Sequence, residues 1–342
     1  MALHKRPLGK SGLEITTVGV GTWAIGGGGW SFGWGQQDDD ASIAAIHRGV
    51  ELGINWIDTA AIYGLGHSEE VVGQALAEIS PAKRPMVFTK CGLSADRSKP
   101  FEPPRRDLRP ETIRRECEAS LRRLGVERID LYQFHWPDES GTAVEESWGE
   151  MQRLKQEGKV RAAGVSNFTV ALLERCERVG HVDSLQPPFS MIRRETAEEL
   201  IPWCASHGTG VIAYSPMQSG LLTDRFGAER VARFAEDDWR RSNAEFQEPN
   251  LSRNLRLRDA LRPIAQRHGT TASAIAVAWT LVWPGVSGAI VGARSAEQVD
   301  GWIRAGEIEL TPQDVEEIAR AIGETQAGKG PARPKALRAS AD

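Results

Sequence analysis

The fold of this chain is decided by the stretch NWIDTAAIYGLGHSEEVVGQALAEISPAKRPMVFTK, residues 55–90. It begins with a short apolar run, residues 55–58, and ends with a second one, residues 86–90. Between them, Ser68 and two glutamates favour a helix start, and apolar residues then recur at helical spacing over 71–79. The stretch therefore predicts a strand, a helix and a second strand, which a crossover helix makes parallel to the first.

The same alternation continues through most of the 342 residues. Further strands are expected at 18–23, 129–135, 160–165, 183–186, 211–214 and 289–291. Helices are expected at 38–52, 110–124, 143–157, 169–179, 195–207, 255–268, 272–282, 295–305 and 312–322. Eight strands with intervening helices predict an α/β fold, a (β/α)8 TIM barrel with an N-terminal β-hairpin and extra C-terminal helices.

Barrels of this kind fold as one domain of about 250 residues or more, so we expect a single domain over residues 1–325. The stretch 216–254 is long, polar and contains tryptophan, which favours a functional loop over the rim. Residues 326–342 are rich in Ala, Gly, Lys and Pro, and this composition predicts a disordered tail.

Composition excludes several classes of function. The net charge is −4, so nucleic acid is not an expected partner. No apolar run approaches the ~20 residues of a membrane span, and the N-terminus lacks a signal pattern. The 4 cysteines are far apart and the histidines form no H-x-H or HExxH pair, which argues against disulfides and metal. We expect a cytoplasmic protein, with a monomer favoured.

Four polar side chains stand at or just past the ends of predicted strands: Asp58, Tyr63, Lys90 and His135. In a parallel barrel they would emerge on one rim, where such folds place active sites. Taken singly, each has an ordinary role as a loop acid, a surface aromatic, a strand-end charge or a packed histidine. Taken together, they predict a proton-transfer site, because a buried lysine needs a charged partner. The ammonium of Lys90 is expected to lower the pKa of Tyr63 below ~10.

One competing motif is rejected. Residues 19–24 fit the G-x-G-x-x-A fingerprint of a dinucleotide-binding Rossmann fold. Glycines follow at 26–29, where the phosphate-binding helix would have to begin, and the acids at 38–40 precede a helix instead of ending a strand.

The segment Asp58-Thr59-Ala60-Ala61-Ile62-Tyr63-Gly64 resembles the DTAxxYG signature of the aldo-keto reductases. Other blocks follow in the family's order between about residues 6 and 320: GTW at 21–23, TK at 89–90, HWPD at 135–138, GVSNF at 164–168, QPP at 186–188, YSP at 214–216, GLL at 220–222 and GARS at 292–295. The details are most similar to the bacterial glyceraldehyde-reductase and general-stress branch.

The resemblance implies reduction of aldehydes or ketones, glyceraldehyde-like or small aromatic, with NADP(H) as the hydride source and no metal. It implies that Tyr63 donates the proton, Lys90 lowers the pKa of that phenol, Asp58 pairs with Lys90, and His135 orients the carbonyl. A substrate pocket is implied at Trp23, Tyr63, His135 and Trp136.

The cofactor residues implied by the resemblance are Gly21, Thr22, Trp23, Asp58, Ser166, Asn167, Gln186, Tyr214, Ser215, Pro216, Met217, Gly220, Leu221, Arg225, Arg241, Gly292, Ala293, Arg294 and Gln298. Arg294 precedes Ser295, an expected helix N-cap, and is the expected partner of a 2′-phosphate. Gly301 and Trp302 stand where the family pattern has an acidic residue and Asn, which leaves the preference for NADPH over NADH open.

Two alternative functions remain open from the sequence. One is a cofactor-sensing regulatory or binding subunit with slow turnover, because such proteins keep the same polar residues. The other is an NADP-dependent polyol or sugar dehydrogenase that works mainly in the oxidising direction.

Overall fold

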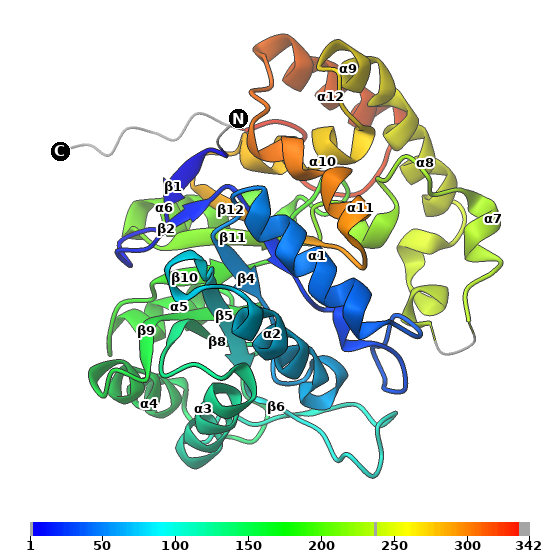
Figure 1. Ribbon diagram of the computed structural model, residues 1–342. Coiled ribbons are helices and arrows are strands. Elements are labelled where there is room, and N and C mark those ends of the chain that lie inside the picture. The colour runs from blue at the N-terminus through cyan, green and yellow to red at the C-terminus, as the bar shows by residue number, and fades with distance from the viewer. Residues whose placement is uncertain (1–2, 236–237, 335–342) are drawn as a thin grey trace.

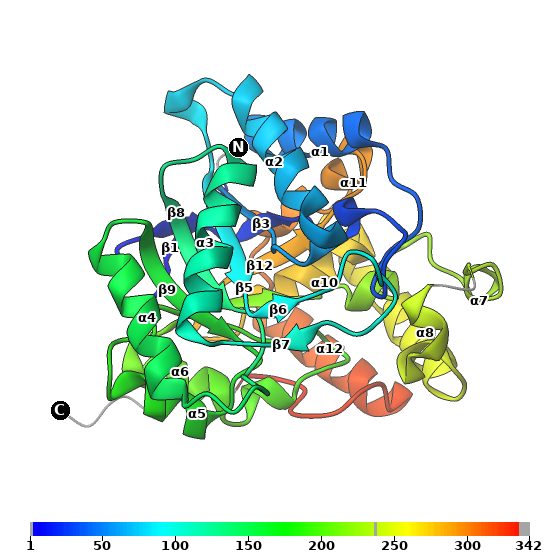
Figure 2. The same ribbon diagram turned by 90° about the horizontal axis from the view of Figure 1, so that it is seen from below.

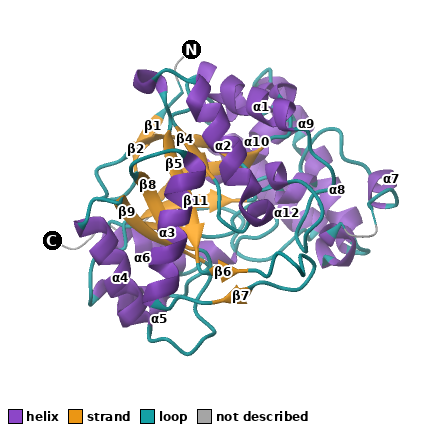
Figure 3. Cartoon of the chain, turned by 60° about the horizontal axis from the view of Figure 1, so that its bottom comes forward, coloured by secondary structure: helices purple, strands orange, loops and turns teal. Residues whose placement is uncertain are grey.

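The computed structural model describes residues 3–235 and 238–334, and its centre is a closed barrel of parallel strands (Figures 1 and 3). In chain order these strands are β3 (Val18–Gly21), β4 (Trp56–Asp58), β5 (Met86–Cys91), β8 (Ile129–Phe134), β9 (Val160–Ser166), β10 (Ser184–Gln186), β11 (Gly210–Tyr214) and β12 (Val286–Gly292). β12 pairs with β3 and closes the ring, so the predicted (β/α)8 barrel is confirmed.

Helices surround the barrel, as the purple ring around orange strands in Figure 3 shows. They are α1 (Asp39–Glu51), α2 (His67–Glu78), α3 (Pro110–Leu124), α4 (Val144–Gln156), α5 (Val170–Glu177), α6 (Leu200–His207), α10 (Ala272–Leu281), α11 (Ala296–Asp300) and α12 (Pro312–Thr325). In α3, Ile113, Cys117 and Leu124 are buried, because their spacing places them on one face of the helix.

The N-terminal hairpin, β1 (Lys5–Pro7) and β2 (Glu14–Thr16), closes one end of the barrel. Its Leu8, Leu13 and Ile15 are fully buried against Trp56 and Phe88, which point into the barrel from β4 and β5. Because apolar side chains fill this end, the open rim for chemistry is the opposite one, where the strands end.

The glycines of β3 have a packing role. A Cβ at Gly19 would lie 2.2 Å from the Trp56 ring, and one at Gly21 would lie 2.6 Å from Ile290. The chain then enters a short 3-10 turn, Ala24–Gly26, and not a long helix. The apparent dinucleotide fingerprint at 19–24 therefore reflects close packing inside the barrel.

Several predicted helices differ in detail. α2 begins at His67 with Gly66 in the N-cap position, and the Ser68 hydroxyl is buried and donates to the Thr22 carbonyl oxygen. Ser68 therefore ties the first turn of α2 to the chain that follows β3 and is not a helix cap. The helix expected at 195–207 is a 3-10 turn, Glu195–Ala197, followed by α6. That expected at 295–305 is α11 followed by a 3-10 turn, Ile303–Gly306.

The helix expected at 255–268 is two helices, α8 (Asn250–Ala260) and α9 (Arg262–Arg267). The break falls before Pro263, which lacks the N–H needed to continue a helix. The stretch 216–254 contains α7 (Ala228–Val231) and 3-10 turns, and it projects to the right of the barrel in Figure 1. A two-stranded ribbon, β6 (Leu93–Ser94) and β7 (Arg105–Arg106), follows the end of β5 (Figure 2).

The expectation of disorder from residue 326 is wrong for residues 326–334. The buried Arg194 guanidinium donates to the carbonyl oxygens of Ala327 at 3.0 Å and Gly330 at 3.1 Å. Gly328 permits the approach, since a Cβ there would collide with the Ile192 carbonyl. Composition concealed this segment because main-chain hydrogen bonds to Arg194, with only small apolar side chains such as buried Ala327, hold it in place. Residues 335–342 lie outside the described part of the chain.

None of the helices in the described residues is both long enough and apolar enough to span a membrane.

Candidate active site

Three of the predicted polar side chains meet at the open rim. The Lys90 ammonium donates to Asp58 Oδ1 at 2.5 Å, to the Thr59 carbonyl oxygen at 2.8 Å and to the Tyr63 phenol oxygen at 3.3 Å. His135 follows β8, and its ring lies 5.6 Å from the Tyr63 ring in an edge arrangement. The four residues therefore share one site, with Lys90 buried behind Tyr63.

A tight loop places Tyr63 there. Gly64 has a positive φ of 58°, and a Cβ on it would lie 2.3 Å from the Gly26 carbonyl oxygen. The glycine thus lets the loop after β3 pack directly against the residue that follows the phenol. The residue order Tyr63-Gly64 is explained by this close approach.

The second oxygen of Asp58 is also bonded. It accepts from the side-chain amides of Gln186 at 2.9 Å and Gln133 at 3.4 Å. Gln133 was not predicted from the sequence, where its signal is a polar residue inside the apolar run 129–135. These amides fix the carboxylate, so the Asp58–Lys90 pair is held in one orientation.

The electrostatics differ from the expectation for Tyr63. Burial, followed by the negative charge of Asp58, raises the pKa of Tyr63 well above its usual value of 10.0. The prediction that Lys90 lowers the pKa of Tyr63 is wrong for this structure, because burial disfavours the phenolate and the charge of Asp58 offsets the ammonium. Burial likewise lowers the pKa of Lys90, against the opposing effect of Asp58. The phenol is therefore protonated at neutral pH and available as an acid.

Burial, together with the charge of Lys90, holds the pKa of His135 well below 6.5. Its ring is therefore neutral at neutral pH. The Nδ1 atom is buried and finds no hydrogen-bond partner among the described residues. A neutral imidazole carries a single N–H, which it can donate to an oxygen.

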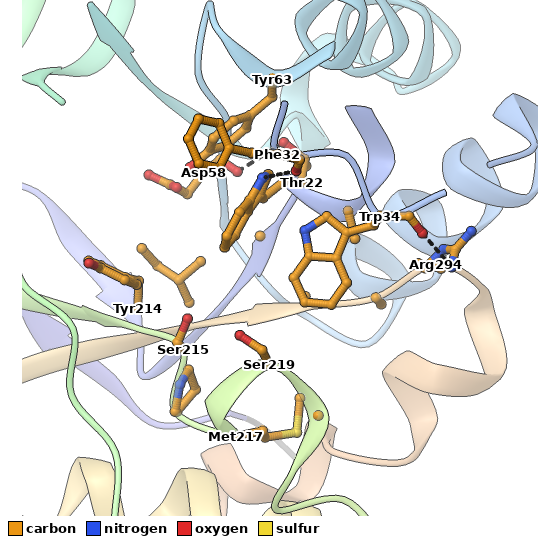
Figure 4. A pocket seen from close by; sticks show the side chains of 18 of the residues that line it. Thr22, Phe32, Trp34, Asp58, Tyr63, Tyr214, Ser215, Met217, Ser219 and Arg294 are labelled. Atoms are coloured by element: carbon orange, nitrogen blue, oxygen red, sulfur yellow. Dashed lines mark hydrogen bonds between the residues drawn. The ribbon is translucent and has the colours of Figure 1, made fainter. Parts of the chain in front are cut away.

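A cavity of about 1110 Å³ begins at Tyr63 and His135 and extends to Arg294 and Gln298. Figure 4 shows Tyr63, Tyr214, Ser215 and Ser219 around this space, with Arg294 at its edge beyond Trp34. The predicted residues that line it are Gly21, Thr22, Trp23, Asp58, Tyr63, His135, Trp136, Ser166, Asn167, Gln186, Tyr214, Ser215, Pro216, Met217, Gly220, Arg225, Gly292, Ala293, Arg294 and Gln298.

Comparisons with known proteins agree on one relationship. The model of the Aldo/keto reductase family matches residues 17–322. The chain is 34% identical to the aldo-keto reductase YhdN of Bacillus subtilis, covering 91% of both chains. It is 34% identical to the NADH-specific methylglyoxal reductase of Escherichia coli, over 94% of this chain and 99% of that one.

The chain belongs to the aldo/keto reductase family. A similar solved structure is that of the glycerol dehydrogenase AKR11B4 from Gluconobacter oxydans, with 39% identity and a TM-score of 0.84 over 95% of this chain and 97% of that one. The holo form of aldo-keto reductase AKR11C1 from Bacillus halodurans has 26% identity and a TM-score of 0.76, over 93% and 96%.

The family uses a nicotinamide cofactor, and the cavity of this aldo/keto reductase fits one. At the catalytic end, Tyr214 presents an aromatic ring, and its hydroxyl donates to Asn167 Oδ1 at 2.9 Å. Asn167 Nδ2 donates to Ser166 Oγ at 3.0 Å, and Ser166 donates to the Gln186 carbonyl oxygen at 2.7 Å. A ring face beside hydroxyl and amide groups suits a planar ring with a carboxamide.

Three guanidinium groups, those of Arg230, Arg240 and Arg294, line the cavity beside the carboxylates of Asp224, Glu297 and Asp300. Burial, followed by the charges of Arg240 and Arg230, lowers the pKa of Arg294. Arg294 is already bonded, donating to Gln37 Oε1 at 2.5 Å and to the Trp34 carbonyl oxygen at 3.4 Å. Ser295 occupies the N-cap of α11 as expected, but its side chain makes no capping bond.

Two expected cofactor residues do not line the cavity. Leu221 is fully buried in the hydrophobic core, and its amide donates to the Gln218 carbonyl oxygen. Arg241 is exposed, whereas its neighbour Arg240 lines the cavity. Arg240 and Arg241 both lie in the 3-10 turn Trp239–Ser242, where successive side chains point about 120° apart. The sequence alone therefore could not show which of the two arginines faces the cavity. Arg225 lines the mouth but is exposed and pairs with Glu297 at 3.1 Å.

The substrate end has aromatic walls. The Trp23 ring stacks on Trp239 with centroids 5.3 Å apart and lies 6.3 Å from the Tyr63 ring. Trp239 was not singled out from the sequence, and its only signal was its place in the long tryptophan-bearing loop. Trp136, on the other side, packs under the Arg106 guanidinium at 4.5 Å.

The described residues contain no cluster of three or more His, Cys, Asp and Glu side chains placed to hold a metal ion.

Protonation of His135 should be visible in stability. The folded-state pKa lies below 6.5, so the unfolded chain takes up the proton first as the pH falls. The free energy of unfolding therefore does not depend on His135 protonation above pH 6.5. Below pH 6.5 it falls as the pH falls, by up to about 1.4 kcal/mol per pH unit. Urea unfolding between pH 5 and 7.5 gives the free energy of unfolding at each pH. Its slope against pH should be shallower in His135→Gln than in the wild type. His4→Gln, which changes an exposed ring, should keep the wild-type slope; equal slopes in all three proteins would contradict the assignment.

Proposed function

We propose that this protein reduces small aldehydes or ketones to alcohols with NADPH, with Tyr63 as the proton donor. The observation that carries the proposal is the 3.3 Å contact between the Tyr63 phenol and Lys90, itself paired with buried Asp58 beside the cavity. This arrangement supports an acid that donates to a substrate oxygen and is held in place by a lysine.

When bound, the nicotinamide supplies a hydride to the carbonyl carbon. Tyr63 is protonated at neutral pH and gives its proton to the carbonyl oxygen as negative charge develops there. Neutral His135 donates its ring N–H to the same oxygen and stabilises that charge. Lys90 holds the phenol oxygen, and the side chains of Ser166, Asn167 and Gln186 orient the carboxamide against Tyr214.

Substrate size is suggested by the walls and by the relatives. Aromatic rings of Trp23, Trp136 and Trp239 favour a small substrate with an apolar or flat part. Two similar proteins are a methylglyoxal reductase and a glycerol dehydrogenase, and both methylglyoxal and glycerol are small oxygenated compounds. The similarity to the glycerol dehydrogenase also supports a rival proposal, oxidation of a polyol with NADP+.

The test is cofactor oxidation with methylglyoxal, glyceraldehyde and benzaldehyde, each with NADPH and NADH, beside NADP+ reduction with glycerol. Reduction of at least one aldehyde, faster than glycerol oxidation, is the expected result. Faster glycerol oxidation would favour the dehydrogenase, and cofactor binding without turnover in either direction would favour a binding subunit.

The preference for NADPH is proposed to depend on Arg294. Removing its guanidinium in Arg294→Ala should weaken NADPH binding about 10- to 100-fold, the size of a lost charge-assisted hydrogen bond. NADH, which lacks the 2′-phosphate, should bind nearly as before. Tryptophan fluorescence titrations measure both affinities. Equal losses for the two cofactors would rule out a phosphate contact at Arg294. Arg241→Ala, at an exposed arginine that does not line the cavity, serves as the control.

A further inference from the structure

The guanidinium of Arg294 is shared with a loop of this chain. The segment 34–37, which follows β3, offers it three acceptors: the carbonyl oxygens of Trp34 and Gln36 and the side-chain oxygen of Gln37. The contact is reciprocal, because Gln37 Nε2 donates back to the Arg294 carbonyl oxygen at 2.9 Å. The group expected to receive a phosphate therefore already has partners within the protein.

The geometry of these bonds matters for an anion. A phosphate pairs best with a guanidinium through two parallel N–H groups on one edge. On Arg294, the edge formed by Nε and Nη2 is filled by Gln37 and the Gln36 carbonyl. The Nη1 atom has one bond, at 3.4 Å, to the Trp34 carbonyl. A phosphate oxygen can bond to Nε only if Gln37 leaves, because this nitrogen carries a single N–H, which Gln37 occupies.

The acceptors differ in how easily they move. Trp34 packs edge-on against Trp23 at 5.3 Å and against Trp239 at 5.8 Å, and the Arg240 guanidinium covers its ring. These contacts fix the main chain of the segment. Gln37, in contrast, reaches Arg294 through a half-buried side chain with rotatable bonds. Its amide nitrogen also donates to Ser42 Oγ at 3.0 Å and to the Asp38 carbonyl oxygen at 3.2 Å, so the side chain can swing away only by breaking these bonds too.

We propose that Gln37 is a specificity-determining residue, whose side-chain oxygen competes with the 2′-phosphate of NADPH for the Arg294 guanidinium. NADPH binding includes the loss of the Gln37 contact, whereas NADH leaves that contact in place. Gln37 therefore narrows the difference in affinity between the two cofactors. This inference rests on the proposed function, in which Arg294 is the phosphate contact.

Binding titrations of the Gln37→Leu variant test the proposal without turnover. Leucine keeps a similar size and removes both the competing oxygen and the amide nitrogen. NADPH and 2′,5′-ADP should bind about tenfold more tightly than to the wild type, because the hydrogen bonds of the Gln37 side chain, among them the one to the charged guanidinium, no longer have to be broken. NADH and 5′-AMP should bind as before. An unchanged or smaller ratio of NADPH to NADH affinity in this variant overturns the proposal.

A second variant should change the affinity for 2′,5′-ADP in the opposite direction. Gln37→Glu places a carboxylate against the guanidinium, which strengthens the contact and should weaken 2′,5′-ADP binding at least tenfold relative to 5′-AMP. The matched control is Gln36→Leu, since the Gln36 side chain is exposed and the residue contributes its main-chain carbonyl to Arg294. That control should titrate like the wild type, and a shift equal to that of Gln37→Leu would count against the role of Gln37.

The Arg294→Ala variant separates this inference from the proposed function. If Arg294→Ala weakens NADPH selectively while Gln37→Leu changes nothing, the competition fails and the phosphate contact stands. If Arg294→Ala affects both cofactors equally, the phosphate contact itself is wrong. Thermal unfolding of each variant verifies that the barrel is intact.

Discussion

Turnover of the Tyr63→Phe variant should fall by about 10²- to 10⁴-fold, which is the usual contribution of a positioned general acid. Phenylalanine keeps the ring that lies against Trp23 and removes only the hydroxyl that contacts Lys90. Lys90 retains its bonds to Asp58 and to the Thr59 carbonyl oxygen. Single-turnover cofactor oxidation measures the loss, and fluorescence titration should show unchanged cofactor affinity.

The chain supplies a matched control for that variant. Tyr132 is also fully buried, but its hydroxyl donates to the Ile113 carbonyl oxygen at 3.5 Å, outside the cavity. Tyr132→Phe makes the same chemical change and should retain turnover. Near-normal turnover in Tyr63→Phe would remove the proton donor from the proposal, and an equal loss in both variants would indicate a structural effect.

Breaking the buried ion pair should have the largest effect on stability. Lys90 and Asp58 are both almost completely buried, with exposed side-chain fractions of 0% and 3%. Lys90→Met leaves the carboxylate of Asp58 without its counter-charge, and loss of one partner of a buried pair typically costs about 3–5 kcal/mol. Turnover should also fall, because Tyr63 loses the group that holds its oxygen. Urea unfolding and single-turnover assays measure the two effects.

The double variant Lys90→Met with Asp58→Asn separates charge from catalysis. It removes both charges, and the new asparagine side chain would keep an oxygen for the amide of Gln186, so part of the lost stability should return. Turnover should stay low, since the lysine is still missing. A double variant as unstable as Lys90→Met alone would show that the cost of that substitution is lost packing and not an unpaired charge.

Much of the barrel could be predicted from periodicity. The apolar runs that end at Asp58 and Lys90 are strands, and the helix between them starts within one residue of Ser68. Local patterns succeeded because buried parallel strands are continuously apolar and the covering helices bury one face. Local patterns failed at Pro263, whose missing N–H divides the expected helix in two. They also failed at residues 326–334, which main-chain contacts to Arg194 hold in place.

The residues at the open rim could be predicted in part, because they depend on strand direction. Parallel strands bring their ends to one side, so Asp58, Lys90 and His135 had to emerge together. The sequence could not give the pKa of Tyr63, because its direction depends on burial and on the distance to Asp58 as well as on Lys90. It also missed Trp239 and Arg240, which a loop distant in sequence brings to the cavity.

The sequence by itself determined the family, the closed barrel and the identity of the polar groups at its open rim, since these follow from local spacing and from strand direction. Only the tertiary structure decided that Gln37 and Arg294 bind each other, that Arg240 rather than Arg241 faces the cavity, and that the phenol of Tyr63 keeps its proton. The physical reason is that each of these depends on burial and on distances between residues remote in the chain, which no pattern along the sequence records.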